Sequence, residues 1–186
     1  IGDLPEFIET ESNSTLELAE ELVLPVTVNG QICGERDIDF YRLSLTAGEL
    51  LSCEVMARRL GSRLEPVSSI LDGDGRPLTI QRDHLGNDPV IAFRAPRTDT
   101  YYLQIKNVSF HGDPAHVYRI NLAVGKFARY CHPLVARRGS QQSFSLMYLT
   151  GDGTLGTLEQ VMTVAPDASI LEITHPELGN SMKIPD

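Results

Sequence analysis

The clearest alternation of apolar and polar residues in the chain lies between Asp37 and Ser62. A side-chain period of two is typical of a β-strand with one buried and one solvated face. The pattern predicts two strands over 38–58, joined by a tight turn at Ala47-Gly48-Glu49 in which Gly48 supplies backbone freedom. We expect this hairpin to form the centre of a β-sandwich. The expected inward side chains are Tyr41, Leu43, Leu45, Leu51, Cys53, Val55 and Ala57.

Short stretches of the same kind continue on both sides of this hairpin. Between residues 23 and 125 the sequence predicts about eight short strands, with no helical period of useful length between them. Asn29-Gly30 is a strong turn signal between Val28 and Ile32. Asp72-Gly73-Asp74-Gly75 also reads as a turn, because it lacks the spaced acids of a calcium-binding EF-hand loop. This organisation predicts an all-β fold, an antiparallel β-sandwich of the jelly-roll kind.

The two ends of the chain have a different character. Residues 1–22 form an acidic N-terminal arm, in which Ser14-Thr15-Leu16-Glu17 has the pattern of a capping box. We expect a short helix over 14–21, which ends before Pro25. Residues 126–186 contain further alternating stretches, such as Phe144, Leu146 and Tyr148. They predict either a second small β module or strands packed on the first.

Composition and charge narrow the possible functions. The chain has 186 residues, 41% of them hydrophobic and 22% charged, which is ordinary for a globular protein. A formal net charge of −9 argues against a nucleic-acid partner and suits a solvated extracellular protein or a cation binder. Trp is absent, and no apolar run is long enough to span a membrane. Because the chain starts at Ile1 without an initiator Met, we expect it to be a piece of a longer protein.

Reactive side chains form no familiar catalytic pattern. The three cysteines are an odd number, and Cys53 falls on the inward face of its strand, which favours a buried free thiol over a Cys33–Cys53 disulfide. The five histidines lie in or near predicted loops and no two have zinc-binding spacing. The pair Arg58-Arg59 is expected to be solvated charge. The sequence contains neither a nucleophile elbow nor a phosphate-binding loop.

Residues from about 5 to 125 carry a series of short motifs whose order and spacing resemble a known family. They resemble the bacterial pre-peptidase C-terminal domain, a secreted β-sandwich module often found beside peptidases, in a variant found in large secreted proteins of planctomycete-type bacteria. A weaker resemblance to the start of an immunoglobulin-like module covers 132–151. The matching motifs of the first family are Val23-Leu24-Pro25, Val28-Asn29-Gly30, Asp37-Ile38-Asp39-Phe40-Tyr41-Arg42-Leu43, Ala47-Gly48-Glu49, Arg59-Leu60-Gly61-Ser62, Ile70-Leu71-Asp72 with Gly75, Phe93-Arg94-Ala95-Pro96, Thr100-Tyr101-Tyr102-Leu103 and Tyr118-Arg119-Ile120.

The resemblance implies a calcium site. Collagen-binding members of the family hold calcium between an acidic N-terminal segment of pattern Glu-x-Glu-x-Asn-Asp and the acidic start of a strand. Here the first segment is matched by Glu9, Glu11 and Asn13, with Ser14 in place of the final acid. Asp39 matches in the second segment, whereas the other expected acid falls at Arg36, so that Glu35 or Asp37 would have to substitute. The candidate ligands are therefore Glu9, Glu11, Asn13, Asp37 and Asp39. The alternative is that these residues are solvated charges, caps and turn formers.

Two functions remain open at this point. The first is a non-catalytic accessory or binding module of a larger secreted, periplasmic or surface protein, stabilised by calcium, whose partner is a polysaccharide, a protein fibre or a neighbouring domain. The second is a structural spacer without a ligand of its own. A hydrolase is less favoured, because no charged catalytic pair has a recognisable spacing. The outer face of the sandwich, where Tyr102 and Phe40 are expected, discriminates the two, since an exposed aromatic patch favours binding.

Overall fold

The computed structural model describes residues 4–82, 88–150, 154–167, 169–179 and 181–185. The chain divides into two compact units, Ile1–Val124 and Gly125–Asp186. Each unit has its own cluster of buried apolar side chains. The candidate ligands all lie in the first unit.

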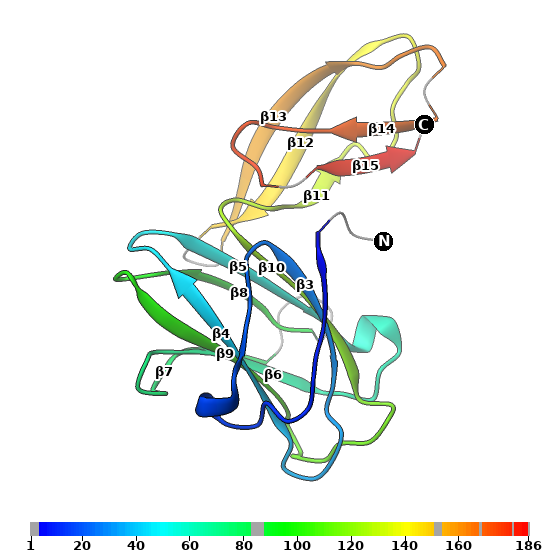
Figure 1. Ribbon diagram of the computed structural model, residues 1–186. Coiled ribbons are helices and arrows are strands. Elements are labelled where there is room, and N and C mark those ends of the chain that lie inside the picture. Colours follow the sequence, from blue (N-terminus) through cyan, green and yellow to red (C-terminus); the bar gives the residue numbers. More distant parts are fainter. Residues whose placement is uncertain (1–3, 83–87, 151–153, 168, 180, 186) are drawn as a thin grey trace. The chain divides into compact units, whose positions relative to one another are not determined.

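The first unit is a sandwich of two five-stranded sheets (Figure 1). Strands pair antiparallel except at two edges, where β1 pairs parallel with β3 and β2 pairs parallel with β4. The predicted all-β sandwich is therefore confirmed. The first sheet has the order β1 (Glu6–Ile8), β3 (Val26–Gln31), β10 (Val117–Val124), β5 (Leu50–Met56) and β8 (Val90–Arg94). The second has the order β2 (Glu20–Glu21), β4 (Ile38–Leu45), β9 (Asp99–Asn107), β6 (Pro66–Leu71) and β7 (Pro77–Gln81).

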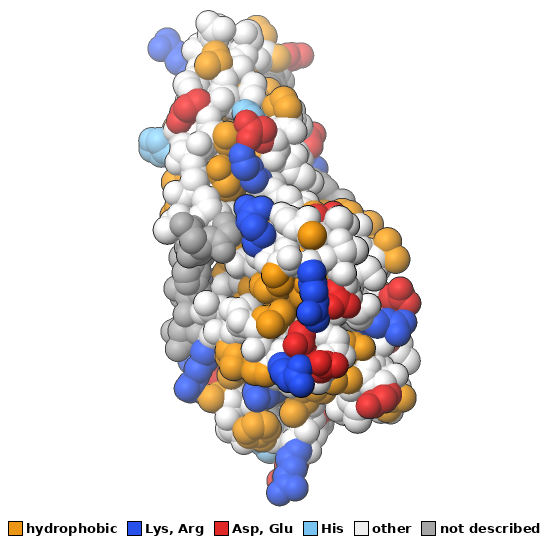
Figure 2. Space-filling model, turned by 90° about the vertical axis from the view of Figure 1, so that its left-hand side faces the viewer, with side chains coloured by type: hydrophobic (Ala, Val, Ile, Leu, Met, Phe, Trp, Pro, Cys, Tyr) orange, Lys and Arg blue, Asp and Glu red, His pale blue; other side chains and the backbone are white. Residues whose placement is uncertain are grey.

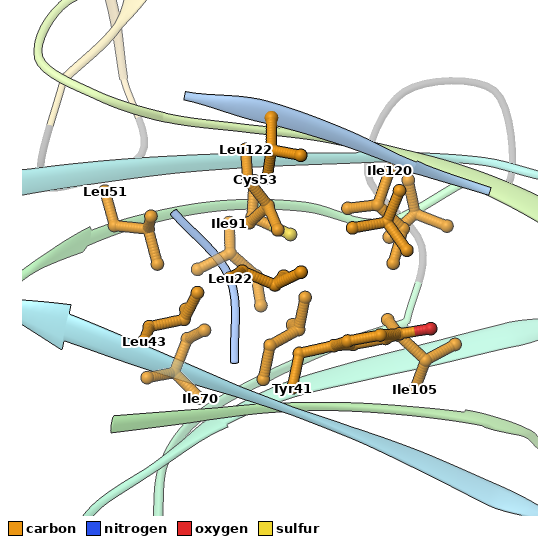
Figure 3. Packing of buried hydrophobic residues seen from close by; sticks show 14 of the residues in the cluster. Leu22, Tyr41, Leu43, Leu51, Cys53, Ile70, Ile91, Ile105, Ile120 and Leu122 are labelled. Carbon is orange, nitrogen blue, oxygen red and sulfur yellow. The ribbon is translucent and has the colours of Figure 1, made fainter. Parts of the chain in front are cut away.

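The core of the first unit fills the space between these sheets. Figure 3 shows Leu51 and Leu122 of the first sheet pointing towards Leu43 and Ile70 of the second. All seven side chains predicted to face inward between Tyr41 and Ala57 are buried. Cys53 is among them and carries a free thiol, as expected from the pattern. The alternation was sufficient to find the core face because side chains of a strand point to opposite sides in turn.

The expected hairpin over 38–58 is wrong in one respect. Strands β4 and β5 lie in different sheets, and the turn between them crosses from one sheet to the other. Gly48, with a φ of 85°, and Glu49 both make backbone hydrogen bonds to Ala95. β4 pairs with β9, and β5 pairs with β10 and β8. A hairpin and such a crossing both bury alternate residues, so the pattern along the chain does not distinguish them.

The turn predicted at Asn29-Gly30 is also wrong, because both residues lie inside β3. Gly30 pairs with Tyr118 of β10. A Cβ atom at Gly30 would lie 2.4 Å from the ring of Tyr118 and 2.5 Å from a carboxylate oxygen of Glu9. This glycine therefore allows the close approach of two side chains, which is the other common use of glycine in a strand.

The predicted helix over 14–21 is reduced to the 3-10 turn η1 (Leu16–Leu18). Its N-cap position is Thr15, which makes no capping side-chain bond, and the Ser14 hydroxyl instead donates to Asp37. The helix cannot continue because Glu20 and Glu21 form β2 and pair with β4. The N-terminal arm thus adds one strand to the edge of each sheet.

Three smaller elements complete the first unit. The segment Asp72 to Gly75 is a turn, as predicted, in which an Asp72 carboxylate oxygen accepts from the backbone N–H groups of Asp74 and Arg76. Arg59 is not simply solvated, because it forms ion pairs with Glu54 and with the buried Asp88 next to η2 (Arg58–Leu60). His116 is buried rather than exposed, and its ring is bonded to Asp113. His84 lies outside the described residues.

The second unit contains a three-stranded sheet and a two-stranded ribbon. Of the three alternating residues named from the sequence, Phe144 and Leu146 point into its core, whereas Tyr148 is only half-buried. The described strands of this unit pair with one another, and the motif Gly151-Asp152-Gly153 lies outside the described residues. The elements are β11 (Ala128–His132), β12 (Gln141–Leu149), β13 (Leu155–Thr163), β14 (Ile170–Ile173) and β15 (Met182–Pro185).

Candidate cation site

The carboxylate of Glu9 sits in the middle of a small polar network inside the first unit. Glu9 directly follows β1, and its backbone N–H donates to the carbonyl of Asn29. Its Oε1 lies within hydrogen-bonding distance of the hydroxyl oxygens of Tyr41 and Tyr118, at 3.1 and 3.0 Å. Its Oε2 accepts from the backbone N–H of Gln31 at 2.7 Å. Glu9 therefore joins the N-terminal arm to both sheets.

Asp39 and Asn13 are completely buried beside this carboxylate. Asn13 donates from Nδ2 to Glu9 at 2.9 Å, and its backbone carbonyl accepts from the N–H of Phe40. Asp39 accepts through Oδ2 from the Tyr118 hydroxyl at 2.5 Å. The other side-chain oxygen of each residue, Oδ1, is buried and has no hydrogen-bond partner. Buried oxygens without partners are rare and costly, so their presence calls for a physical explanation.

The electrostatics of this inner group are unfavourable without a counter-ion. Burial, together with the negative charge of Glu9, raises the pKa of Asp39 to about 9. Burial and the same charge raise the pKa of Tyr41, and burial with the neighbouring Tyr41 and Asp39 raises that of Tyr118. Among the described residues, no Lys, Arg or His forms an ion pair with Glu9 or Asp39. A cation between the carboxylates would lower the free energy of their ionised forms.

Glu11 and Asp37 form an outer group together with Cys33. One potential ligand atom from each of the three side chains lies within 4.8 Å of the other two. The backbone N–H of Cys33 donates to Asp37 at 2.6 Å, and the Ser14 hydroxyl donates to the other carboxylate oxygen at 3.3 Å. A hydrogen bond to Glu11, partial burial and the surrounding carboxylates raise the pKa of the Cys33 thiol to about 12.

The two groups belong to one cluster. Glu9 and Asp37 act electrostatically on both the Cys33 thiol and the Asp39 carboxyl, so the outer and inner groups are close to each other. All five predicted ligands are thus brought into one region, although Asp37 and Glu11 reach it from the exposed side. The structure adds Tyr41, Tyr118 and Cys33, which sequence reasoning treated as core or unassigned residues. A Tyr at an inward strand position was an available signal, because a buried Tyr hydroxyl usually needs a partner.

The residue types present fit calcium. Ca²⁺ takes six to eight oxygen ligands from carboxylates, amide carbonyls and water. The unpartnered Oδ1 atoms of Asn13 and Asp39 are one amide and one carboxyl oxygen, and Glu9 adds a carboxylate between them. Ser14, which replaces an acid of the family pattern, keeps a contact to Asp37 rather than lying free.

A groove of about 570 Å³ adjoins this cluster on the outer side of β1, β3 and β10. Its lining includes Glu9, Glu11 and Cys33 of the cluster and the apolar side chains of Ile8, Leu60 and Val117. These three apolar side chains are exposed to solvent. The remaining lining residues are Asn29, Gly30, Gln31, Tyr118 and Arg119.

The known proteins that are similar to this chain come from bacteria. No family model matches the chain. Among solved structures, the pre-peptidase C-terminal domain of a collagenase from Bacillus anthracis is similar, with a TM-score of 0.42 and 16% identity, over 57% of this chain and 93% of that one. That domain belongs to the family that the motifs of this chain resemble. A periplasmic inhibitor of g-type lysozyme, PliG of Aeromonas hydrophila, is similar with a TM-score of 0.45 and 13% identity, over 64% of this chain and 98% of that one.

One curated relative has a similar sequence. It is a probable subtilase-type serine protease of Deinococcus radiodurans, 32% identical over 85 residues, which are 43% of this chain and 12% of that protein. The chain therefore spans a small part of this relative. In the part of the chain that the structure describes, no helix is both long and apolar enough to cross a bilayer.

Proposed function

We propose that the first unit is a non-catalytic accessory module of a larger secreted bacterial protein, and that a calcium ion fixes its N-terminal arm. The observation that carries the calcium part is the buried pair of unpartnered oxygens, Asn13 Oδ1 and Asp39 Oδ1, beside the carboxylate of Glu9. A bound Ca²⁺ supplies positive charge and a coordination partner to all three residues. Glu11 and Asp37 complete the ligand set from the exposed side.

The arm is the element that such an ion would stabilise. Glu9, Glu11 and Asn13 come from the arm, whereas Asp37 and Asp39 come from β4 and the residues before it. Binding to the folded state alone stabilises it by RT ln(1 + [L]/Kd), about 2.7 kcal/mol when calcium is at a hundred times its Kd. Fixing the arm would hold the point at which the chain enters this unit, which suits a module placed beside another domain.

An accessory role accords with the sequence relative. The matched segment is a small part of a probable subtilase-type serine protease, so a module beside a catalytic domain is a natural context. The partner is then a neighbouring domain, or a polysaccharide or protein fibre that the larger protein acts on. The location of such a protein is extracellular, periplasmic or on the cell surface.

The exposed surface favours the second candidate, a structural spacer. Phe40 is buried and Tyr102 is half-buried, and the exposed large aromatic side chains among the described residues are Phe110 and Tyr130, which belong to different units. On the face shown in Figure 2, basic, acidic and apolar side chains are interspersed. A binding role would therefore rely on the groove beside the acidic cluster, with Ile8 and Val117, rather than on an aromatic patch.

Calorimetry tests the calcium proposal. The melting temperature of the protein is measured in EDTA and at increasing CaCl₂, and we expect it to rise in the wild type and not in Asp39→Ala. Asp74→Ala is the matched control, because Asp74 is an exposed turn residue paired with Arg76. Wild-type protein whose melting temperature is the same in EDTA and calcium would overturn the proposal.

A pulldown experiment distinguishes a binding module from a structural spacer. The wild type and Val117→Lys are incubated with a panel of insoluble polysaccharides and collagen-like fibres, with and without calcium. Retention of the wild type that is lost in Val117→Lys supports a binding module that uses the groove. If the wild type binds none of the matrices, the structural spacer is favoured.

A further inference from the structure

Strand β13 of the second unit has a free edge, because it lies at the end of the three-stranded sheet (Figure 1). Val164, directly after β13, donates its backbone N–H to the carbonyl of Ser140, directly before β12. Backbone groups in an antiparallel ladder point to alternate sides, so those of Glu159, Val161 and the other odd-numbered residues of β13 point away from β12. In place of a strand partner, the carbonyl of Val161 accepts from the side-chain amide of Gln160, at 3.2 Å.

The other edge strands that the structure describes each have a feature that discourages pairing with a further strand. Strands β1, β2, β14 and β15 have four residues or fewer. Strand β7 begins with Pro77, and its register with β6 shifts. The register of β11 with β12 shifts as well, and the short strand β8 ends at Arg94. In contrast, β13 has nine residues, pairs with β12 over its whole length without a shift, and contains no Pro, Lys or Arg.

Glu159 is the single charged residue of β13, and its side chain is directed away from the free edge. Its carboxylate oxygens accept hydrogen bonds from the hydroxyls of Ser143 and Ser145, at 2.9 and 2.6 Å. Both serines belong to β12, which is the neighbour on the paired side. The carboxylate of Glu159 therefore does not stand in the way of a strand added on the other side.

The side chains of β13 are complementary to a second copy of the same strand. Leu158 and Met162 are half-buried and pack at the border of the second core. In an antiparallel pair centred on Gln160, Leu158 lies opposite Met162 of the second copy, and Glu159 lies opposite Val161. Apolar residues directly opposite each other stabilise a strand pair, whereas like charges destabilise it. A pair centred on Glu159 would instead bring two carboxylates together.

We propose that the free edge of β13 pairs with the same edge of a second copy of this chain, antiparallel and across a two-fold axis at Gln160. The two three-stranded sheets then join into one continuous sheet. Such an interface is closed, because each copy uses the same edge and leaves none open for a third. Backbone hydrogen bonds provide the attraction, and the side chains of Leu158 and Met162 fix the register. The inference goes beyond the proposed function, which concerns the first unit.

Sedimentation velocity of the full chain over a range of protein concentrations tests the dimer. We expect the wild type to change from monomer to dimer as the concentration rises. Val161→Glu places a second carboxylate opposite Glu159 at two symmetric positions, and should weaken dimerisation about tenfold. Val161→Lys is the matched control, because its charge is attracted to Glu159 of the second copy and the dimer should be retained. Both variants should fold, since Val161 is exposed.

Val161→Pro tests the backbone pairing itself. It removes an N–H group that points to the free edge, and proline is tolerated at such a position of an edge strand. We expect this variant to remain monomeric, with a circular dichroism spectrum like that of the wild type. If it does not fold, the comparison of Val161→Glu with Val161→Lys still decides the question.

Three results would each overturn the inference. The first is a wild type that stays monomeric, which would leave this edge to a strand from another protein or domain. The second is a dimer that persists in folded Val161→Pro, and the third is equal weakening by Val161→Glu and Val161→Lys. None of these substitutions touches the candidate cation site, so the calcium titration of the first unit succeeds or fails independently.

Discussion

Gly30 of β3 lies directly against the ring of Tyr118 of β10, its strand partner across the first sheet. A Cβ atom at Gly30 would be 2.4 Å from the Tyr118 ring and 2.5 Å from Glu9 Oε2, closer than packed atoms can be. Tyr118 cannot turn away because it is buried and its hydroxyl contacts Asp39, Glu9 and Tyr41. The absence of one side chain thus allows the polar network of the cation site to form.

Gly30→Ala should therefore destabilise the first unit and weaken its response to calcium. Overpacking of this kind costs about 1–3 kcal/mol of the free energy of unfolding. The check is urea denaturation in EDTA and in calcium. Gly34→Ala is the matched control, since a Cβ there meets nothing within 4 Å, and we expect a change below about 1 kcal/mol. Equal effects of the two substitutions would show that the close approach at Gly30 is unimportant.

Tyr118→Phe should separate the hydrogen bonds of this residue from its packing. The substitution keeps the ring in the core and removes the hydroxyl that donates to Asp39. Leaving a buried carboxyl oxygen without its donor costs about 1–3 kcal/mol. Tyr101→Phe is the control, because the Tyr101 hydroxyl donates to the carbonyl of Arg97. We expect both variants to lose stability, but only Tyr118→Phe to change the midpoint of a calcium titration.

The raised pKa of Asp39 predicts an unusual pH dependence in the absence of metal. The folded protein holds a proton on Asp39 up to a pKa of about 9, whereas the unfolded chain releases it near the ordinary value of 3.8. Between these values the folded state binds the extra proton, so its stability is highest at low pH and falls as pH rises, by at most about 1.4 kcal/mol per unit.

Asp39→Asn should flatten this slope. Its amide has a similar shape and an oxygen that still accepts from Tyr118, but it carries no charge at any pH. In EDTA at neutral pH we expect the Asp39→Asn variant to be more stable than the wild type by about 1 kcal/mol or more. A pKa shift of one unit corresponds to a free energy of about this size. In saturating calcium the order should reverse, because the ion favours the ionised carboxylate. Denaturation curves from pH 5 to 9 give both results, and identical slopes for the two proteins would contradict the assignment.

Asp88 anchors a different part of the first unit. It is completely buried and accepts from the backbone N–H groups of Arg58 and Arg59 and from the Arg59 guanidinium. Although burial acts to raise its pKa, these hydrogen bonds hold it below the ordinary value. Asp88 therefore stabilises the folded state at pH values above the ordinary pKa of an Asp side chain. This stabilisation is lost as the pH falls through the lowered pKa of the folded state.

Asp88→Ala should lower the free energy of unfolding by about 2–4 kcal/mol. It leaves the backbone N–H groups of Arg58 and Arg59 without an acceptor, and the Arg59 guanidinium loses one of its two carboxylate partners. Asp74→Ala, which removes an exposed pair, should cost less than about 1 kcal/mol. Chemical denaturation measures both. The calcium-dependent shift should survive in each variant, and its loss in Asp88→Ala would show that this carboxylate acts on the cation site.

Part of the candidate site could be predicted from the sequence. Glu9, Glu11, Asn13, Asp37 and Asp39 were found through a family motif and do gather in one region of the first unit. Cys33, Tyr41 and Tyr118 were not assigned to it, since their contacts to these acids join positions up to 109 residues apart. Which oxygens remain without a partner follows from burial, and burial is a property of the assembled sheets.

The sequence by itself determined that the chain is built of strands and which side chains face the core, because alternation depends only on the backbone of each strand. Tertiary structure decided that β4 and β5 belong to opposite sheets, that Asn29-Gly30 continues a strand, and that the N-terminal arm forms two edge strands instead of a helix. These choices depend on which backbone groups find partners when the sheets assemble. The residue pattern within one segment does not specify its partner strand, and the packing of the whole unit does.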